Sequence, residues 1–158
     1  MRVTTTVLAF VLTATAAMAQ GGKAAQAMKD FSSSSDVQAM IAKAKAERKQ
    51  NQPTFSQRIL SLAPYNANLE YRAAVGPASI HEKAAEIFYV IDGSGTLVTG
   101  GTLVKGNPST IEGGTTRPVA KGDFFVVPEN TPHWFSPING VLVLMSLHVP
   151  RPVGGEGH

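Results

Sequence analysis

The sequence predicts an all-β fold, a sandwich or a barrel, for the part of the chain that follows Pro53. Short runs rich in β-branched and aromatic residues recur there, and turn residues such as Gly, Pro and Asn separate them. No helical periodicity interrupts these runs, which favours a sandwich or barrel over an α/β fold. The expected strands are residues 55–62, 68–75, 86–91, 96–98, 117–119, 123–127, 133–135 and 141–148.

A helical arm is expected to precede the strands, at residues 20–52. Its first part, 20–35, is small and polar and indicates a flexible lead-in. Residues 36–50 read as a helix that Ser35 caps, with Gln38 three residues further on as in a capping box. An apolar stripe at helical spacing predicts that one face packs on the outside of the domain: Val37, Met40, Ile41 and Ala44.

The first 19 residues have the three-part pattern of a secretory signal peptide. Arg2 supplies the positive start, residues 7–12 form an apolar run, and Ala17-Met18-Ala19 is an A-x-A cleavage site. We therefore expect cleavage after Ala19 and a periplasmic or secreted protein, the alternative being an uncleaved anchor. Because no run reaches about 18 apolar residues, no membrane span is expected in the mature chain.

Composition excludes several classes of protein. The 158 residues include no cysteine, which excludes disulfides, thiolate metal sites and cysteine nucleophiles. The excess of basic residues belongs to the arm, while residues 53–158 are close to neutral. A nucleic-acid-binding protein would carry a basic patch on its folded surface, so no nucleic-acid partner is expected. We expect a single domain at 53–151 and a frayed Gly-rich tail at 152–158.

Two groups of residues in the strand-rich region have spacings that indicate a binding or catalytic site. His81, Glu86 and Gly93 form the first, and Gly122, Pro128 and His133 form the second. In these spacings the sequence resembles the cupin superfamily over residues 68–150. The first cupin motif has a Gly, a His-x-His pair, a Glu and a closing Gly; the second is Gly-x5-Pro-x-Gly-x2-His-x3-Asn.

The sequence departs from both motifs. Ser79 stands in place of the first motif His, and Ala73 stands where the opening Gly would fall. In the second motif Asn130 replaces the Gly, and Pro137 stands where the Asn would be. The change to Asn is mild, because Asn tolerates left-handed turn geometry. The missing His is not mild, since cupins typically hold a divalent metal with three His and one Glu.

The resemblance implies a cupin-type double-stranded β-helix, or jelly-roll barrel, with a divalent metal ion held by His81, Glu86 and His133. The residue types alone point the same way, because imidazoles and a carboxylate in a barrel interior need a metal or a hydrogen-bonding partner. Iron, manganese, zinc, nickel and copper all suit such ligands. In the metal-free alternative, His81 hydrogen-bonds Glu86 and His133 is a satisfied pocket histidine.

His148 ends the last expected strand and is a candidate substitute for the missing motif His. Both faces of that strand are equally apolar, so the sequence leaves open whether His148 looks inward or lies at the barrel edge. Arg72 is a second open case. It could pair with an anionic substrate, but a surface ion pair is the simpler interpretation.

Two functions from different classes follow. The first is a metal-dependent enzyme of the dioxygenase, isomerase or lyase type that acts on a small molecule, with no catalytic base assigned beyond His148 or metal-bound hydroxide. The second is a non-catalytic periplasmic module that binds a small molecule or a metal. A structural role for the N-terminal helix is a third interpretation. The resemblance also implies a homodimer, in which pairing would shield edge strands.

Overall fold

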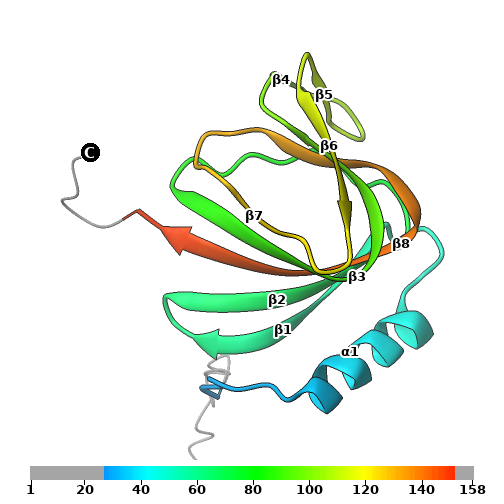
Figure 1. The fold of residues 1–158 in the computed structure, drawn as a ribbon, viewed down its shortest axis with the longest axis vertical. Coiled ribbons are helices and arrows are strands. Elements are labelled where there is room, and N and C mark those ends of the chain that lie inside the picture. Colours follow the sequence, from blue (N-terminus) through cyan, green and yellow to red (C-terminus); the bar gives the residue numbers. More distant parts are fainter. Residues whose placement is uncertain (1–26, 152–158) are drawn as a thin grey trace, which may run out of the picture.

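The computed structural model describes residues 27–151, which form a curled antiparallel barrel with one helix packed outside it (Figure 1). The prediction of an all-β barrel preceded by a helical arm is confirmed. The elements are α1 (Ser34–Glu47), β1 (Thr54–Leu62), β2 (Tyr65–Arg72), β3 (Ala84–Thr99), β4 (Thr102–Val104), β5 (Thr110–Glu112), β6 (Thr115–Ala120), β7 (Phe124–Val127) and β8 (His133–Pro150).

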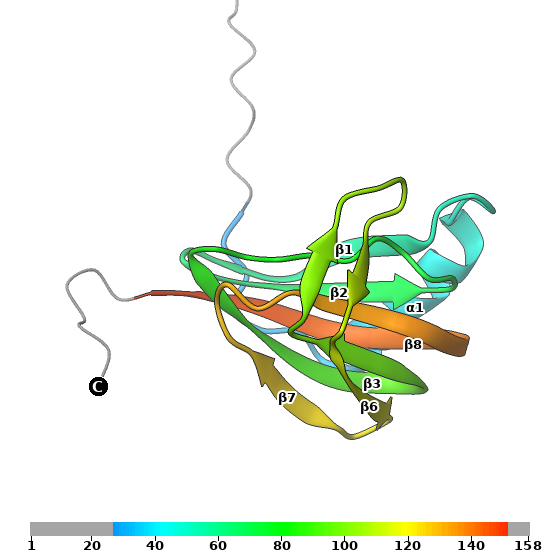
Figure 2. The same ribbon diagram turned by 90° about the horizontal axis from the view of Figure 1, so that it is seen from above.

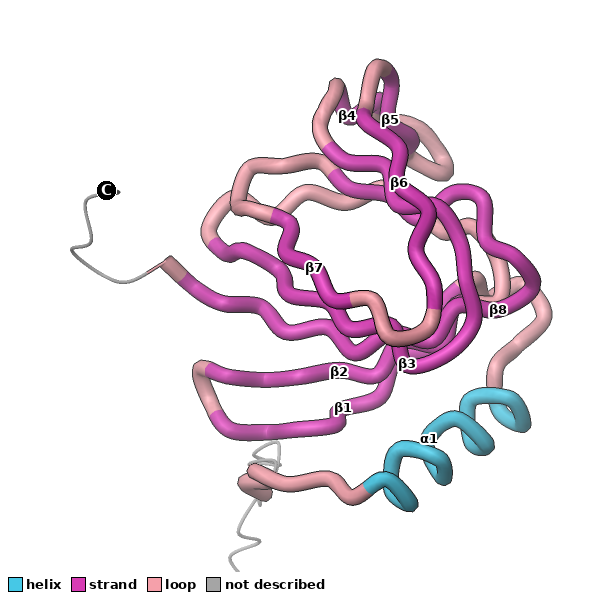
Figure 3. The backbone as a smooth tube through the Cα atoms, in the orientation of Figure 1, coloured by secondary structure: helices cyan, strands magenta, loops and turns pink. Residues whose placement is uncertain are grey.

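One sheet runs in the order β1-β2-β8-β3-β6, and β7 also pairs with β3. Figure 3 shows how β6 and β7 fold back over β3 and β8 and so close the barrel, and Figure 2 shows the same arrangement from above. The pair β4–β5 forms a separate hairpin. The turn between β1 and β2, the start of β3 and the end of β8 lie together at one end, which we call the mouth (Figure 1).

Two expected pairs of short strands are in fact single long strands. The predicted runs 86–91 and 96–98 both lie in β3, and 133–135 and 141–148 both lie in β8. Asp92-Gly93 therefore marks an irregularity within a strand, with register shifts on both sides, and not the predicted turn. Gly93 has a φ of 79°, and a β-carbon there would lie 1.9 Å from the carbonyl oxygen of Val141, so the irregularity requires glycine.

The helix begins two residues earlier than predicted and has a different cap. Ser33, not Ser35, is the N-cap: its hydroxyl accepts from the Asp36 amide at 3.1 Å, and its own amide donates to the Asp36 carboxylate at 2.9 Å. The prediction that Ser35 and Gln38 form the box was wrong: the helix begins at Ser34, so Ser33 is the N-cap and Asp36, three residues after it, completes the box. These hydrogen bonds from Ser33 lower the pKa of Asp36 below its ordinary value.

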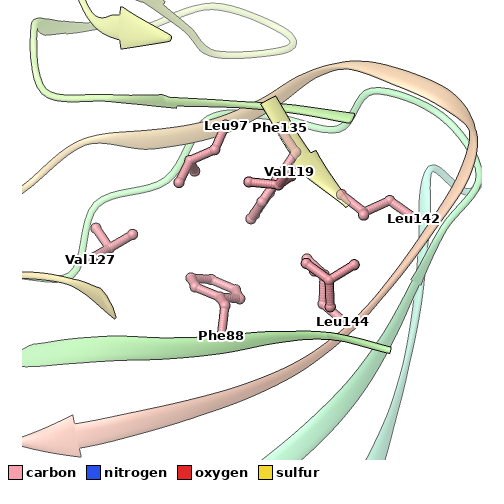
Figure 4. Packing of buried hydrophobic residues seen from close by; sticks show 8 residues of the cluster. Phe88, Leu97, Val119, Val127, Phe135, Leu142 and Leu144 are labelled. Atoms are coloured by element: carbon pink, nitrogen blue, oxygen red, sulfur yellow. The ribbon is translucent and has the colours of Figure 1, made fainter. Parts of the chain in front are cut away.

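Two apolar clusters lie on opposite faces of the sheet. One fills the barrel interior, where Phe88, Leu97, Phe135, Leu142 and Leu144 interdigitate (Figure 4). The other lies between α1 and the outer face of β1, β2 and β8, and buries Ile41 and Ala44 of the helix. Burying one large apolar side chain stabilises the fold by about 1.5–3 kcal/mol, so both clusters hold the barrel together.

Strand β2 places side chains on both faces of the sheet, because successive residues of a strand point to opposite faces. Ala67, Leu69 and Tyr71 are buried beneath the helix. Glu70 and Arg72 alternate with them and face the interior, where the Ser146 hydroxyl donates to Glu70 at 2.9 Å. The barrel interior therefore has an apolar cluster with a polar stripe along β2.

The predicted signal peptide at 1–19 and tail at 152–158 lie outside the described residues, and the domain boundaries stay predictions. Within residues 27–151, no helix has the length and apolar character needed to cross a membrane.

Candidate metal centre

The buried carboxylate of Glu86 is the hub of the candidate site. Glu86 lies on the inner face of β3 and is only 4% exposed. Its Oε2 atom lies 3.1 Å from Nε2 of His81 and 3.2 Å from Nε2 of His133. Its Oε1 atom lies 3.1 Å from Nε2 of His148. Three imidazoles from separate segments thus converge on one carboxylate.

Strand pairing explains how two of these side chains meet. Glu86 on β3 lies directly opposite His148 on β8, so both side chains project from the same face. Directly opposed residues have β-carbons about 5 Å apart, which brings the carboxylate of Glu86 and the imidazole of His148 into contact. The open question about His148 is therefore answered: its strand face looks inward, although the side chain is half exposed at the mouth.

The other two histidines come from the loop before β3 and from the start of β8. Ser79 and His133 exchange both backbone hydrogen bonds, at 2.9 and 2.8 Å, as an isolated antiparallel bridge. This bridge fixes the short segment that carries His81 beside β8. Ser79 consequently projects to the same side as His133.

Asn130 ties the two motif segments together. Its backbone amide donates to the carbonyl of His81 at 2.8 Å. Asn130 has a φ of 55°, so it adopts the left-handed conformation that the family motif assigns to glycine. The prediction that Asn is tolerated at this position is confirmed.

The surroundings of the hub favour an ionised carboxylate at Glu86 and lower the pKa of His81. Burial raises the pKa of Glu86, but the hydrogen bond and charge of His133 and the charges of His148 and His81 outweigh it and hold that pKa below its ordinary value. Burial, reinforced by the other two imidazoles, lowers the pKa of His81 although Glu86 opposes it. Ionised Glu and neutral His are the forms that bind metals.

The environment of His133 bears directly on whether an ion fits. Its Nδ1 atom lies 3.4 Å from the carbonyl oxygen of Thr131, and a carbonyl can only accept. Nδ1 therefore donates there, and Nε2 of the same ring lies 3.2 Å from Oε2 of Glu86. A metal ion at Nε2 would take the place of the proton that this atom otherwise shares with the carboxylate, and the Nδ1 contact to a backbone carbonyl is typical of metal-binding histidines.

The spacing of the nitrogen and oxygen atoms also fits a first-row metal. Two ligand atoms that each lie about 2.1 Å from an ion, at a right angle, are about 3.0 Å apart. The observed separations of 3.1–3.2 Å from Glu86 match that value. One ligand atom each from His81, Glu86 and His148 lie within 4.8 Å of one another, and His133 approaches Glu86 from the buried side.

Comparison with known proteins identifies the family. Residues 32–150 match the family described as Cupin. The chain belongs to the cupin superfamily. No curated protein matches the sequence.

Solved structures share this cupin fold at low sequence identity. The hydroxypropylphosphonic acid epoxidase of S. wedmorenis is 15% identical, with a TM-score of 0.51 over 61% of this chain and 51% of that one. The FeII form of HppE is 14% identical, with a TM-score of 0.52 over 62% and 52%. The cupin domain of Schizosaccharomyces pombe Cnp3 is 14% identical, with a TM-score of 0.51 over 68% and 72%. The chain thus spans about half the length of the epoxidase, and these likenesses show the fold alone.

This cupin lacks one motif histidine, but three histidines still contact Glu86. Ser79 leaves the first motif position without an imidazole, and His148 brings one to Glu86 from the last strand. His148 belongs to neither motif, and the sequence made it only a candidate substitute because both faces of its strand are equally apolar. The alternation Leu142, Leu144, Ser146, His148 places it once the inner face of that strand is known.

Arg72 is committed to an ion pair. Its Nε atom donates to Glu70 at 2.9 Å, and its guanidinium lies 4.7 Å from the centre of the Phe135 ring. The interpretation as an ion pair fits, but the pair is not at the surface, because the two side chains are 16% and 13% exposed. This arrangement makes Arg72 part of the wall and not a free substrate-binding group.

Proposed function

We propose that this cupin binds one divalent transition-metal ion through Glu86, His81 and His148, with His133 completing the set, and uses it on a small molecule. The observation that carries the proposal is the convergence of three imidazole nitrogens on one buried carboxylate at 3.1–3.2 Å. The predicted set of His81, Glu86 and His133 is thereby extended by His148. Iron, manganese, zinc, nickel and copper all accept such ligands.

The residues suit a site that is closed on one side and open on the other. His133 is 4% exposed and lies against Phe88, whereas the side chain of His148 is 48% exposed and that of His81 is 33% exposed. Among the described residues, the side of His81 and His148 is therefore the open one, from which a ligand can enter. A metal ion there would supply Lewis-acid or redox chemistry, which dioxygenases, isomerases and lyases use on small molecules.

A non-catalytic metal- or ligand-binding module is the alternative, and one observation favours it. All three histidines described in the barrel contact Glu86. If each binds the ion, none of them is left as a general base, and catalysis would need a base from the substrate or from bound hydroxide. Turnover of a metal-loaded sample separates the two functions.

Metal content is the decisive measurement. We expect close to one equivalent of a transition metal per chain by inductively coupled plasma mass spectrometry after purification without chelators. His133→Ala should lower that content. A content far below one that His133→Ala leaves unchanged would rule out the metal function.

The proposal includes export and self-association. Export would follow from the signal peptide pattern at residues 1–19, and the mass of the mature protein should show Gln20 as its first residue. Dimerisation is supported by an exposed apolar strip on β3 and β7, where Tyr89, Phe124 and Val126 are 40%, 67% and 56% exposed. Light scattering should report a dimer that Phe124→Asp dissociates; a monomeric native protein would exclude this strip as a self-association surface.

A further inference from the structure

An open cavity of about 520 Å³ lies at the mouth, and its wall includes one residue of the metal centre. Its polar lining residues are Arg58, Asn66, Asn68 and His148. His148 is the residue they share with the hub, where its ring contacts Glu86 at 3.1 Å. A molecule in this cavity therefore lies next to the candidate metal, and the volume is in the range of cavities that hold small molecules.

Strand register places the polar groups in one row. Arg58 on β1 lies opposite Asn68 on β2, and Asn68 lies opposite Ser146 on β8. Directly paired residues project from the same face, so Arg58 and Asn68 look into the barrel side of the sheet with Ser146. Asn66 lies two residues before Asn68 on the same face of β2. The inner face of β2 is thus polar from the mouth to the buried ion pair of Glu70 with Arg72.

Arg58 differs from Arg72 and Arg151, each of which has an acidic partner. Arg72 is paired with Glu70, and Arg151 with Glu129. Among the residues that the structure describes, Arg58 makes no ion pair, and no carboxylate lines the cavity with it. The guanidinium therefore offers its forked N–H groups to a ligand, and the two amides add donors beside it.

We propose that this cavity holds the carboxylate end of a small organic anion, with Arg58 as the charged contact and Asn66 and Asn68 as neutral donors. A guanidinium binds a planar carboxylate through two parallel hydrogen bonds, which makes it selective for that group over a neutral amide. The other end of the ligand lies against His148 and reaches the metal centre. The proposal rests on the proposed function for that second end only.

The test titrates α,ω-dicarboxylates of three to six carbons, each beside its neutral diamide, into protein loaded with Co²⁺. Isothermal titration gives the affinity, and the visible Co²⁺ spectrum reports whether the ligand reaches the metal. We expect at least one dicarboxylate to bind tenfold or more tightly than its diamide. Arg58→Gln should remove that preference, Arg58→Lys should keep part of it, and Arg117→Gln, at an exposed arginine on β6, should leave it unchanged.

Metal loading is measured separately on each variant, so the two proposals fail in different ways. Arg58→Gln should bind Co²⁺ with native stoichiometry, because Arg58 is not part of the hub. If the native protein binds no Co²⁺, the proposed function fails, and the same titration on metal-free protein decides the cavity proposal. An equal affinity for dicarboxylates and diamides, or a preference that survives Arg58→Gln, overturns the cavity proposal.

Discussion

The barrel interior divides into an apolar closed half and a polar half at the mouth. On β3, Phe88 belongs to the apolar cluster, and Glu86, two residues earlier on the same face, is the hub of the candidate metal centre. On β8, Leu144 is packed in the cluster and His148, four residues later, is half exposed. The same two strands therefore carry the core and the site, and a step of two residues on β3 and of four residues on β8 separates them. Stability should belong mainly to one half and chemistry to the other.

The strongest test of this division is a cavity mutation in the closed half. Leu142 is fully buried, and Leu142→Ala should lower the free energy of unfolding by about 2–5 kcal/mol, because it removes packing contacts and leaves a void. Leu62→Ala, at a leucine that is 37% exposed, should cost far less. Urea denaturation measures both. Similar losses for the two variants would contradict the assignment of stability to this half.

The corresponding change in the mouth half is Glu86→Gln. It keeps the size of the side chain but removes the charge on which the three imidazoles converge. We expect metal affinity to fall by about 100-fold or more, which corresponds to about 2.7 kcal/mol. Competition with a chromophoric chelator measures the affinity, and Leu142→Ala, assayed where it is folded, should bind metal like the native protein. If Glu86→Gln binds as tightly as the native protein, the hub does not hold the ion.

Variants at His148 and Ser79 test which side chains of the mouth half set the metal affinity. His148→Ala should weaken metal binding by about tenfold, since it removes one exposed ligand and leaves His81, Glu86 and His133. Ser79 projects to the side of His133, so Ser79→His in the His148→Ala background should restore most of the affinity. The same chelator competition reports both effects. A His148→Ala variant with native affinity would remove His148 from the ligand set.

The smallest expected effect concerns the link between the two motif segments. Asn130→Ala should cost about 1 kcal/mol of stability, because alanine disfavours the left-handed conformation. Asn130→Gly should cost less, because glycine adopts it freely. Thermal unfolding compares the two variants. A more stable alanine than glycine variant would show that the backbone conformation at 130 does not limit stability.

Much of the closed half could be predicted from the sequence. Strand runs and turn residues predict the barrel, and the two motif spacings also point to three residues of the mouth half, His81, Glu86 and His133. The lengths of β3 and β8 could not be predicted, because Gly93 and Asn139-Gly140 look like turns when only local sequence is considered. A bulge in a long strand and a turn between short strands use the same residues, and only pairing with the neighbour distinguishes them.

The mouth half was harder to predict because its residues come from separate strands. His148 reaches the hub through pairing between β3 and β8, and Arg58 reaches the cavity through pairing between β1 and β2. The alternation of polar Asn66, Asn68 and Glu70 with apolar neighbours was visible, but its meaning depends on which side of the sheet α1 covers. The sequence carries the residue types, while the register decides which of them meet.

The direct opposition of Glu86 and His148 has a consequence for folding. Shifting β8 by one residue against β3 would turn His148 to the outer face, and a shift of two would carry it past Glu86. An ion bound by both residues would therefore stabilise only the native alignment and act as a template against misaligned chains. The refolding yield and the unfolding midpoint should then rise with metal concentration in the native protein, and this dependence should weaken in His148→Ala.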